Sequence, residues 1–306
     1  MTPFDAVLLI AFGGPESPGE IRPFLERVTA GRRIPPARLE EVARHYELIG
    51  GRSPLNELTR AQADALRRRL ARDGVTVPVH VGMRNWRPFL DEALAELAAD
   101  GRRRVLGIIL SAFQTEASWD RYITSVETAR EAMTVGAPAV DYARAWSRHP
   151  LFIQAVADRV SATVGEMPQA LQDAPLVFTA HSIPRSMADG SPYAAQFREA
   201  SRRVAQSLGR AHWTLAYQSR SGNPRDPWLE PDVGDVIEEL ARAGKKAAIV
   251  VPIGFVCDHV EVLYDLDVDA RQRARELGMG FYRAPAVNDH PLFIDMLAEI
   301  VSASRW

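Results

Sequence analysis

The chain has 306 residues, of which 46% are hydrophobic and 25% are charged, so it can bury a core and is not intrinsically disordered. Its 37 basic and 39 acidic residues leave a net charge of −2, which excludes the basic footprint of a nucleic-acid-binding protein. The single cysteine, Cys257, excludes an intrachain disulfide, a four-cysteine zinc site and a self-contained iron–sulfur cluster.

The first predicted element is the apolar run at residues 6–12. This run is too short to span a membrane. It follows Asp5 rather than a basic segment, so it lacks the pattern of a signal peptide. We therefore expect a cytoplasmic protein with no integral membrane segment.

Along the chain, short apolar runs alternate with amphipathic helical segments. The runs lie at 5–11, 77–82, 104–110 and 138–142 in the first half, and at 174–180, 213–217, 247–253 and 280–283 in the second half. Continuous apolar runs between helices are typical of parallel strands buried on both faces. Segment 16–60 departs from this alternation and carries several arginines and two Gly/Pro-rich turns.

An internal repeat indicates how these elements are grouped. The pentapeptide His149-Pro-Leu-Phe-Ile153 recurs as His290-Pro-Leu-Phe-Ile294, and each copy follows the last apolar run of its half. We therefore predict an α/β fold of two similar doubly wound, Rossmann-like lobes, 1–148 and 149–306, each with a parallel four-stranded sheet. The strand ends should converge on one cleft, and the final helix, 291–304, should pack back on the N-terminal lobe.

The segment after the run at 247–253 carries an acidic pattern. Glu261, Asp265 and Asp269 are spaced i, i+4 and i+8, which places them on one face of a predicted helix. Such a stripe is either screened by solvent or used to attract a cation. Apolar neighbours suggest that Glu261 is partly buried, whereas Asp265 and Asp269 should be solvated. If burial raised the pKa of Glu261, its carboxyl could carry a proton at neutral pH.

A histidine lies at the end of another apolar run. His181 follows residues 174–180 and begins the turn His181-Ser182-Ile183-Pro184. A histidine at a strand end is often only a hydrogen-bonding partner, but doubly wound lobes build their sites at such ends. One imidazole and one carboxylate are too few ligands for a tight structural metal site. They suit transient handling of a divalent ion such as Fe²⁺ together with proton removal.

The remaining candidate residues and motifs do not indicate a reactive site. His259 and Cys257 are predicted to be structural, the first because it points to another side of the helix from Glu261. The chain has no G-x-G-x-x-G or Walker pattern, and Ser182 has no nucleophile-elbow motif, so a phosphate-binding or hydrolase site is not indicated.

Five motifs together resemble the ferrochelatases, in particular the Gram-positive and actinobacterial members that use coproporphyrin III. They lie in the family's order over essentially the whole chain, at 8–18 (LLIAFGGPESP), 45–55 (HYELIGGRSPL), 180–184 (AHSIP), 217–220 (YQSR, with Trp228 and Leu229 following) and 251–265 (VPIGFVCDHVEVLYD). The resemblance implies two α/β lobes, chelatase-like, that enclose a porphyrin cleft.

The resemblance also implies roles for individual residues. His181 and Glu261 would be the catalytic and metal-contacting residues, one of them receiving protons from the pyrrole nitrogens. Asp265 and Asp269 match an outer path for the metal. The porphyrin-binding positions implied are Phe12, Arg52, Ser53 and Tyr122.

One position departs from the resemblance, and one segment bears on the substrate. Many relatives carry a tyrosine at the position of Phe12 that can ligate the product iron, and phenylalanine cannot do this. The extra propionates of coproporphyrin could be served by arginines of segment 16–60, although most of these are expected to be ordinary surface charges. Those arginines are Arg22, Arg27, Arg32, Arg33, Arg38 and Arg44.

The expected function is insertion of ferrous iron into coproporphyrin III, which gives coproheme in heme biosynthesis. Iron is then a substrate, and neither a tightly bound cofactor nor an iron–sulfur cluster is expected. The alternatives are a protoporphyrin IX ferrochelatase giving protoheme, a chelatase for cobalt or nickel, and a non-catalytic tetrapyrrole carrier. Because the sequence ends at Trp306 without an extension, we expect a monomer, with transient contact to neighbouring heme-pathway enzymes and no nucleic-acid partner.

Overall fold

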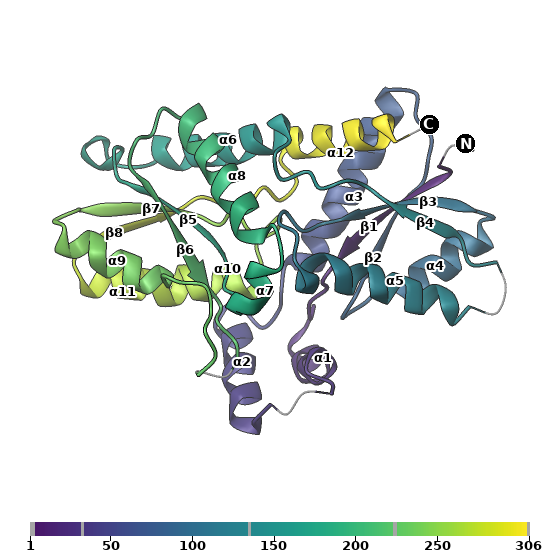
Figure 1. The fold of residues 1–306 in the computed structure, drawn as a ribbon, viewed down its shortest axis with the longest axis horizontal. Helices are drawn as coiled ribbons and strands as arrows, with labels where there is room; N and C mark the ends of the chain where they lie inside the picture. Colours follow the sequence, from purple (N-terminus) through teal and green to yellow (C-terminus); the bar gives the residue numbers. More distant parts are fainter. Residues whose placement is uncertain (1–3, 32–33, 134–135, 223–224, 305–306) are drawn as a thin grey trace. The chain divides into compact units, whose positions relative to one another are not determined.

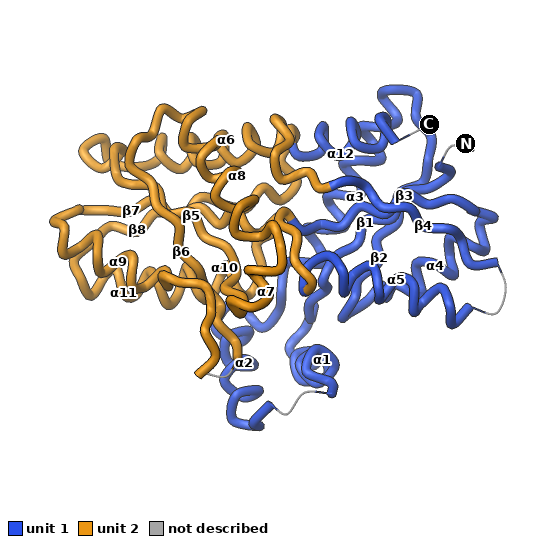
Figure 2. The backbone as a smooth tube through the Cα atoms, in the orientation of Figure 1, with its two compact units in different colours: residues 1–111, 117–144, 293–306 blue, residues 112–116, 145–292 orange. Residues whose placement is uncertain are grey.

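A computed structural model describes residues 4–31, 34–133, 136–222 and 225–304 of the chain (Figure 1). The chain divides into two compact units (Figure 2). Unit 1 comprises Met1–Ser111, Ala117–Arg144 and Phe293–Trp306, and unit 2 comprises Ala112–Glu116 and Ala145–Leu292. The sequence-based lobe boundary after residue 148 stays a prediction, and each unit is described below by itself.

Unit 1 is built on a parallel four-stranded sheet in the order β2-β1-β3-β4. Every residue of the first strand is buried, which explains its uninterrupted apolar sequence. The strands are β1 (Ala6–Ala11), β2 (Val79–Met83), β3 (Arg104–Ile109) and β4 (Ala139–Tyr142). Its helices after residue 48 are α3 (Leu55–Arg72), α4 (Leu90–Ala99), α5 (Arg121–Glu131) and α12 (Pro291–Ala303), and a π-helical turn, η2 (Glu116–Asp120), precedes α5.

Unit 2 repeats this plan, with a parallel four-stranded sheet in the order β6-β5-β7-β8. Its strands are β5 (Leu176–His181), β6 (Trp213–Gln218), β7 (Ala247–Val251) and β8 (Gly280–Arg283). Its helices are α6 (Pro150–Gly165), α7 (Arg185–Asp189), α8 (Tyr193–Ser207), α9 (Val233–Arg242), α10 (Val260–Leu263) and α11 (Arg271–Glu276), with short turns η3 (Gln169–Leu171) and η4 (Asp265–Ala270). The predicted fold class, with its two similar parallel sheets, is confirmed.

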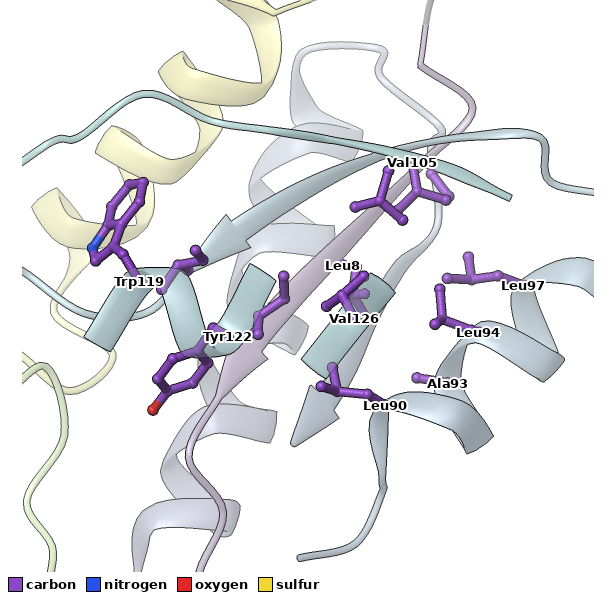
Figure 3. Packing of buried hydrophobic residues seen from close by; sticks show 13 residues of the cluster. Leu8, Leu90, Ala93, Leu94, Leu97, Val105, Trp119, Tyr122 and Val126 are labelled. Carbon is purple, nitrogen blue, oxygen red and sulfur yellow. The ribbon is translucent and has the colours of Figure 1, made fainter. Parts of the chain in front are cut away.

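The core of unit 1 holds the sheet against two helices (Figure 3). Leu8 of β1 and Leu94 of α4 are completely buried, as is Val126 of α5. Burying a leucine-sized side chain contributes about 1.5–3 kcal/mol. This packing fixes the strand ends that the functional residues follow.

Segment 16–60 forms η1 (Pro18–Glu20), α1 (Ile21–Val28), α2 (Pro36–Leu48) and the start of α3. Phe24 of α1 is buried, and its ring meets the rings of Phe12, Tyr46 and Trp86 edge-on, with centroids 5.9–6.4 Å apart. The arginine-rich segment is therefore anchored beside the turn that follows β1.

The last helix returns to unit 1. Residues of α12 from Phe293 onward belong to that unit, and Arg69 Nε of α3 donates a 2.5 Å hydrogen bond to Asp295. Among the residues that the structure describes, none of the helices has the length and hydropathy needed to cross a membrane.

Candidate functional site

His181 is the last residue of β5 and is partly exposed. It pairs in register with Gln218, the last residue of β6, at the carboxyl edge of the unit 2 sheet. Its Nδ1 bonds to the carbonyl oxygen of Ser182, and since a carbonyl only accepts, Nδ1 carries a hydrogen. The hydroxyl of Tyr193 donates to the His181 carbonyl at 2.9 Å. These contacts leave Nε2 as the ring nitrogen available for chemistry.

Glu261 faces that nitrogen. Its Oε1 lies 3.5 Å from His181 Nε2, so the structure brings together the two residues that the sequence singled out from separate segments. Two contacts fix the Glu261 backbone: its N–H donates to His259 Nδ1 at 3.1 Å, and its carbonyl accepts from Gln218 Nε2 at 2.5 Å. Helix α10 therefore begins with His259 as its N-cap and presents the carboxylate to the imidazole.

The pair perturbs the pKa values of both partners. Burial alone would lower the pKa of His181, but the Glu261 carboxylate outweighs it and raises this pKa above its ordinary value. Burial alone would raise the pKa of Glu261, but the His181 charge outweighs it and lowers this pKa. Both shifts favour an imidazolium facing a carboxylate over a neutral histidine facing a protonated glutamate.

Asp265 differs from the prediction. It was expected to be solvated, but burial raises its pKa to about 7, with the charge of Glu261 adding to the effect and a hydrogen bond from Ser219 opposing it. Ser219 follows β6 with a left-handed φ of 61°, and its hydroxyl donates to the Asp265 carboxylate, which favours the charged form and only partly offsets the effect of burial. Asp265, rather than Glu261, is the carboxyl that titrates near neutral pH.

The acidic stripe is not one regular helix. Helix α10 ends at Leu263, and the turn from Asp265 onward is π-helical, with the N–H of Asp269 donating to the carbonyl of Tyr264 at 3.0 Å. Asp269 is exposed, as predicted. It lies on the wall of a surface cavity of about 360 Å³ that Asp232 and Arg273 also line.

The two residues predicted to be structural, Cys257 and His259, precede Glu261 in the chain. His259 caps α10, its ring meets Phe255 edge-on at 4.9 Å, and burial lowers its pKa. The charges of Glu261 and His181 also act on that pKa, so the ring is closer to the pair than the helical spacing indicated. Cys257 is buried.

Sequence reasoning missed the roles of Gln218 and Ser219. Gln218 is buried at 1% exposure and holds the backbone of Glu261, while Ser219 holds the carboxylate of Asp265. The available signal was the motif at 217–220, which directly follows an apolar run.

In unit 1, the turn after β1 exposes Phe12, whose side chain is 39% accessible. Gly13 has a φ of 85°, and a Cβ there would come within 2.8 Å of the backbone nitrogen of Trp86, so only glycine fits. Asn56 fixes the next residue, because its Oδ1 accepts from the N–H of Gly14 at 2.8 Å and its Nδ2 donates to the Gly14 carbonyl at 2.9 Å. Asn56 was also missed from the sequence.

The other predicted porphyrin-binding residues differ in exposure. Ser53 is buried, its N–H donates to the Pro15 carbonyl at 2.8 Å, and its hydroxyl accepts from the Leu55 N–H at 3.3 Å. Arg52 is exposed and lies 3.7 Å from Glu57.

Tyr122 lies on α5 and is 7% exposed within the hydrophobic cluster of unit 1. Its hydroxyl points away from the other labelled side chains of the cluster (Figure 3).

The arginines of segment 16–60 mostly serve local contacts. Arg22 Nη2 donates to Glu40 at 2.7 Å, and Arg38 forms an ion pair of 2.7 Å with Glu41. The guanidinium of Arg27 lies 4.2 Å from the ring centre of Phe89. Arg44 is exposed. Arg32 and Arg33 lie outside the described residues.

The metal-binding capacity of the site is limited. Among residues 4–31, 34–133, 136–222 and 225–304, no group of three or more histidine, cysteine, aspartate or glutamate side chains is arranged to hold a metal ion. His181 and Glu261 offer an arriving ion one nitrogen and one carboxylate.

Comparison with known proteins identifies the family. The family model named Ferrochelatase matches residues 4–305. A ferrochelatase from Rhodopirellula baltica is 44% identical over 98% of this chain and 86% of its own length. A coproporphyrin III ferrochelatase from Frankia alni is 45% identical over 98% of this chain and 80% of its own length.

A solved structure with the same fold supports the architecture alone. It is a multi-domain protein from Deinococcus radiodurans with structural similarity to chelatases, and it superposes with a TM-score of 0.60 at 15% identity. The match covers 99% of this chain and 56% of that larger protein.

Proposed function

We propose that this chain, which belongs to the ferrochelatase family, inserts ferrous iron into coproporphyrin III and releases coproheme in heme biosynthesis. The substrate is the one named for the Frankia alni relative. The structural observation that carries the proposal is the separation of 3.5 Å between His181 Nε2 and Glu261 Oε1 at the carboxyl edge of a sheet.

The chemistry sets three requirements. The flat macrocycle must bend so that its pyrrole lone pairs become reachable, two N–H protons must leave, and the ion must lose its water. Contacts remote from the metal can supply the bending, since binding energy made elsewhere can be used for distortion. The remaining two requirements fall to ionisable side chains.

We assign proton acceptance to His181. In the resting pair its imidazole is protonated, because Glu261 raises its pKa. An arriving dication disfavours the imidazolium, so the ring releases its proton to bulk water and its free Nε2 can accept a proton from a pyrrole N–H. Once that proton has also passed to water, the ring can accept the proton of the second pyrrole N–H, so two protons reach solvent for each ion inserted. Glu261 stabilises the imidazolium at each transfer and supplies a carboxylate oxygen to the ion.

The metal path follows the change in exposure along the acidic segment. Asp269 is exposed on its cavity and can attract a hydrated ion. Asp265 is more buried, and because its pKa is raised to about 7, it is a ligand only in its ionised form. Glu261 then receives the ion beside His181.

We propose that Phe12 packs on the macrocycle, and that Arg52, Ser53 and Tyr122 bind its periphery. The exposed guanidinium of Arg52 suits a propionate, because guanidinium and carboxylate pair through two parallel hydrogen bonds. Phe12 has no atom that can ligate the product iron.

We also propose that the protein is a cytoplasmic monomer that makes transient contacts with neighbouring enzymes of the pathway. We propose that it has no tightly bound cofactor and that iron is only a substrate. Sedimentation and metal analysis of the purified protein test the oligomeric state and the metal content.

The first experiment is anaerobic Fe²⁺ insertion followed by absorbance, with coproporphyrin III and protoporphyrin IX measured side by side. We expect turnover on coproporphyrin III and its loss in His181→Ala. Preference for protoporphyrin IX would show that the substrate assignment is wrong and would leave the proposed mechanism unchanged. Preference for cobalt or nickel would indicate another chelatase, and tight porphyrin binding without turnover would indicate a carrier.

A further inference from the structure

The segment from Asp258 to Asp269 carries Glu261 and Asp265 in an irregular helical stretch. Helix α10 contains four residues, and the π-helical turn η4 that follows it leads into α11. The change from α- to π-helical hydrogen bonding between Glu261 and Asp265 makes their positions depend on more than regular helix geometry. Contacts from outside the segment therefore help to set where Glu261 and Asp265 lie.

Arg283 supplies contacts to both ends of the segment. Its Nη1 donates to Asp258 Oδ1 at 2.9 Å, three residues before Glu261. Its Nη2 donates to Asp267 Oδ2 at 2.7 Å, and its Nε lies 2.9 Å from both Asp267 oxygens, two residues after Asp265. One planar guanidinium thus bridges two carboxylates on either side of the site residues.

The bridge is shielded from water. The exposed fractions of the side chains are 12% for Arg283, 14% for Asp258 and 23% for Asp267. Burial opposes the charge of Arg283, but the two carboxylates prevail and raise its pKa, so the guanidinium stays charged. Charge-assisted hydrogen bonds with this little solvent are among the stronger contacts in a protein.

The bridge is also anchored to the sheet. Arg283 is the last residue of β8 and lies in register with Val250 of β7. On the other side of Asp258, the Asn288 amide closes a reciprocal pair: Asn288 Nδ2 donates to Asp258 Oδ2, and the Asp258 N–H donates to Asn288 Oδ1, both at 2.9 Å. The sheet edge, through Arg283, therefore holds the segment at two points.

We infer that Arg283 is a positioning residue for iron insertion, which keeps Glu261 opposite His181 and Asp265 behind it without itself contacting metal or porphyrin. The inference rests on the proposed function for its kinetic consequence. Its geometric content, that Arg283 holds the segment from Asp258 to Asp269 in place, can be measured without turnover.

The test compares Arg283→Lys with Arg271→Lys. Lysine keeps the charge but cannot span two carboxylates. Arg271 is the matched control, because it also donates to Asp267, at 2.9 Å, but its side chain is 42% exposed and its Nη1 donates to the Phe281 carbonyl instead of a second carboxylate. Changes of residues that orient metal ligands typically lower activity or metal affinity by about 10- to 100-fold.

For Arg283→Lys we expect kcat to fall about 10-fold and KM for Fe²⁺ to rise, with the Kd for coproporphyrin III within about twofold of wild type. Rates are normalised to porphyrin-binding sites, so that misfolded protein is not counted. Hydrogen exchange of the ligand-free protein should be faster in peptides covering 258–269 and unchanged in β5 and β7. Arg271→Lys should leave both readouts near wild type.

Two results would overturn the inference: wild-type kcat and KM per binding site in Arg283→Lys, or unchanged exchange at 258–269. A lower melting temperature with unchanged normalised kinetics would show a purely structural role. If wild type inserts no iron, the proposed function fails, and hydrogen exchange alone decides the positioning role. If Arg283→Lys does not fold, Asp258→Asn removes one end of the bridge and is held to the same readouts.

Discussion

The turns that follow β1 and β5 occupy the same place in two sheets of identical strand order, yet they carry different chemistry. After β1 the chain has Phe12 and two glycines, with an exposed ring and a backbone fixed by Asn56. After β5 it has His181, whose imidazole is held by backbone contacts and faces Glu261. Under the proposed function, a repeated scaffold gives one half a binding surface and the other half the reactive groups.

The largest expected effect comes from removing the imidazole of His181, which follows β5. His181→Ala should lower kcat for iron insertion at least about 100-fold, because general acid–base residues contribute about 10²–10⁴-fold. The Kd for porphyrin, measured by fluorescence quenching, should change little. A variant that keeps more than about a tenth of the wild-type kcat would contradict the assignment.

The next effect separates the two members of the reactive pair. Glu261→Gln should lower the pKa of His181 toward its ordinary value, since the carboxylate raises it, and NMR titration of the imidazole measures this directly. We also expect kcat to fall about 10- to 100-fold. An unchanged imidazole titration would show that the two side chains do not interact in solution.

The same pair makes stability depend on pH. The raised pKa of His181 contributes stability that is fully present below its unfolded value of about 6.5 and is lost as pH rises through the folded value. The lowered pKa of Glu261 contributes stability above about 4.3 that is lost as pH falls through its folded value. The difference in melting temperature between wild type and Glu261→Gln should therefore be greatest between these two limits.

A smaller effect is expected on the binding side. Phe12→Ala should weaken porphyrin affinity about 3- to 10-fold, because an aromatic contact contributes about 0.5–1.5 kcal/mol beyond its buried area. At saturating porphyrin, kcat should stay close to wild type, in contrast to His181→Ala. If kcat fell and affinity did not, the division of roles between the two turns would be wrong.

The smallest effect concerns Asp265. Its folded pKa is raised to about 7, so the folded state binds a proton between the unfolded value of about 3.9 and pH 7 that the unfolded state has released. This carboxyl therefore costs stability as pH rises through that range. Asp265→Asn should raise the melting temperature at pH 8 and leave it nearly unchanged at pH 3. An equal shift at both values would contradict the raised pKa.

The fold could be predicted from the sequence because buried parallel strands need continuous apolar runs, and each predicted run contains or overlaps a strand of the structure. His181 and Glu261 could also be predicted as candidate site residues, since both follow such runs. The raised pKa of Asp265 could not be predicted, because it comes from burial of the carboxyl, which depends on packing between distant segments and leaves no local sequence pattern. The bridging role of Arg283 left no pattern either, since its partners Asp258 and Asp267 lie 25 and 16 residues away in the chain.

The return of α12 to unit 1 has a consequence for biosynthesis on the ribosome. Strands β1 to β4 are translated before most of unit 2, but the helix that contributes Phe293 and Asp295 to their unit is translated after it. Unit 2 is encoded as an almost continuous stretch and can acquire all its strands while the chain is still tethered. Unit 1 therefore stays incomplete until unit 2 has been synthesised, which lengthens the time for which its apolar surface is exposed to aggregation.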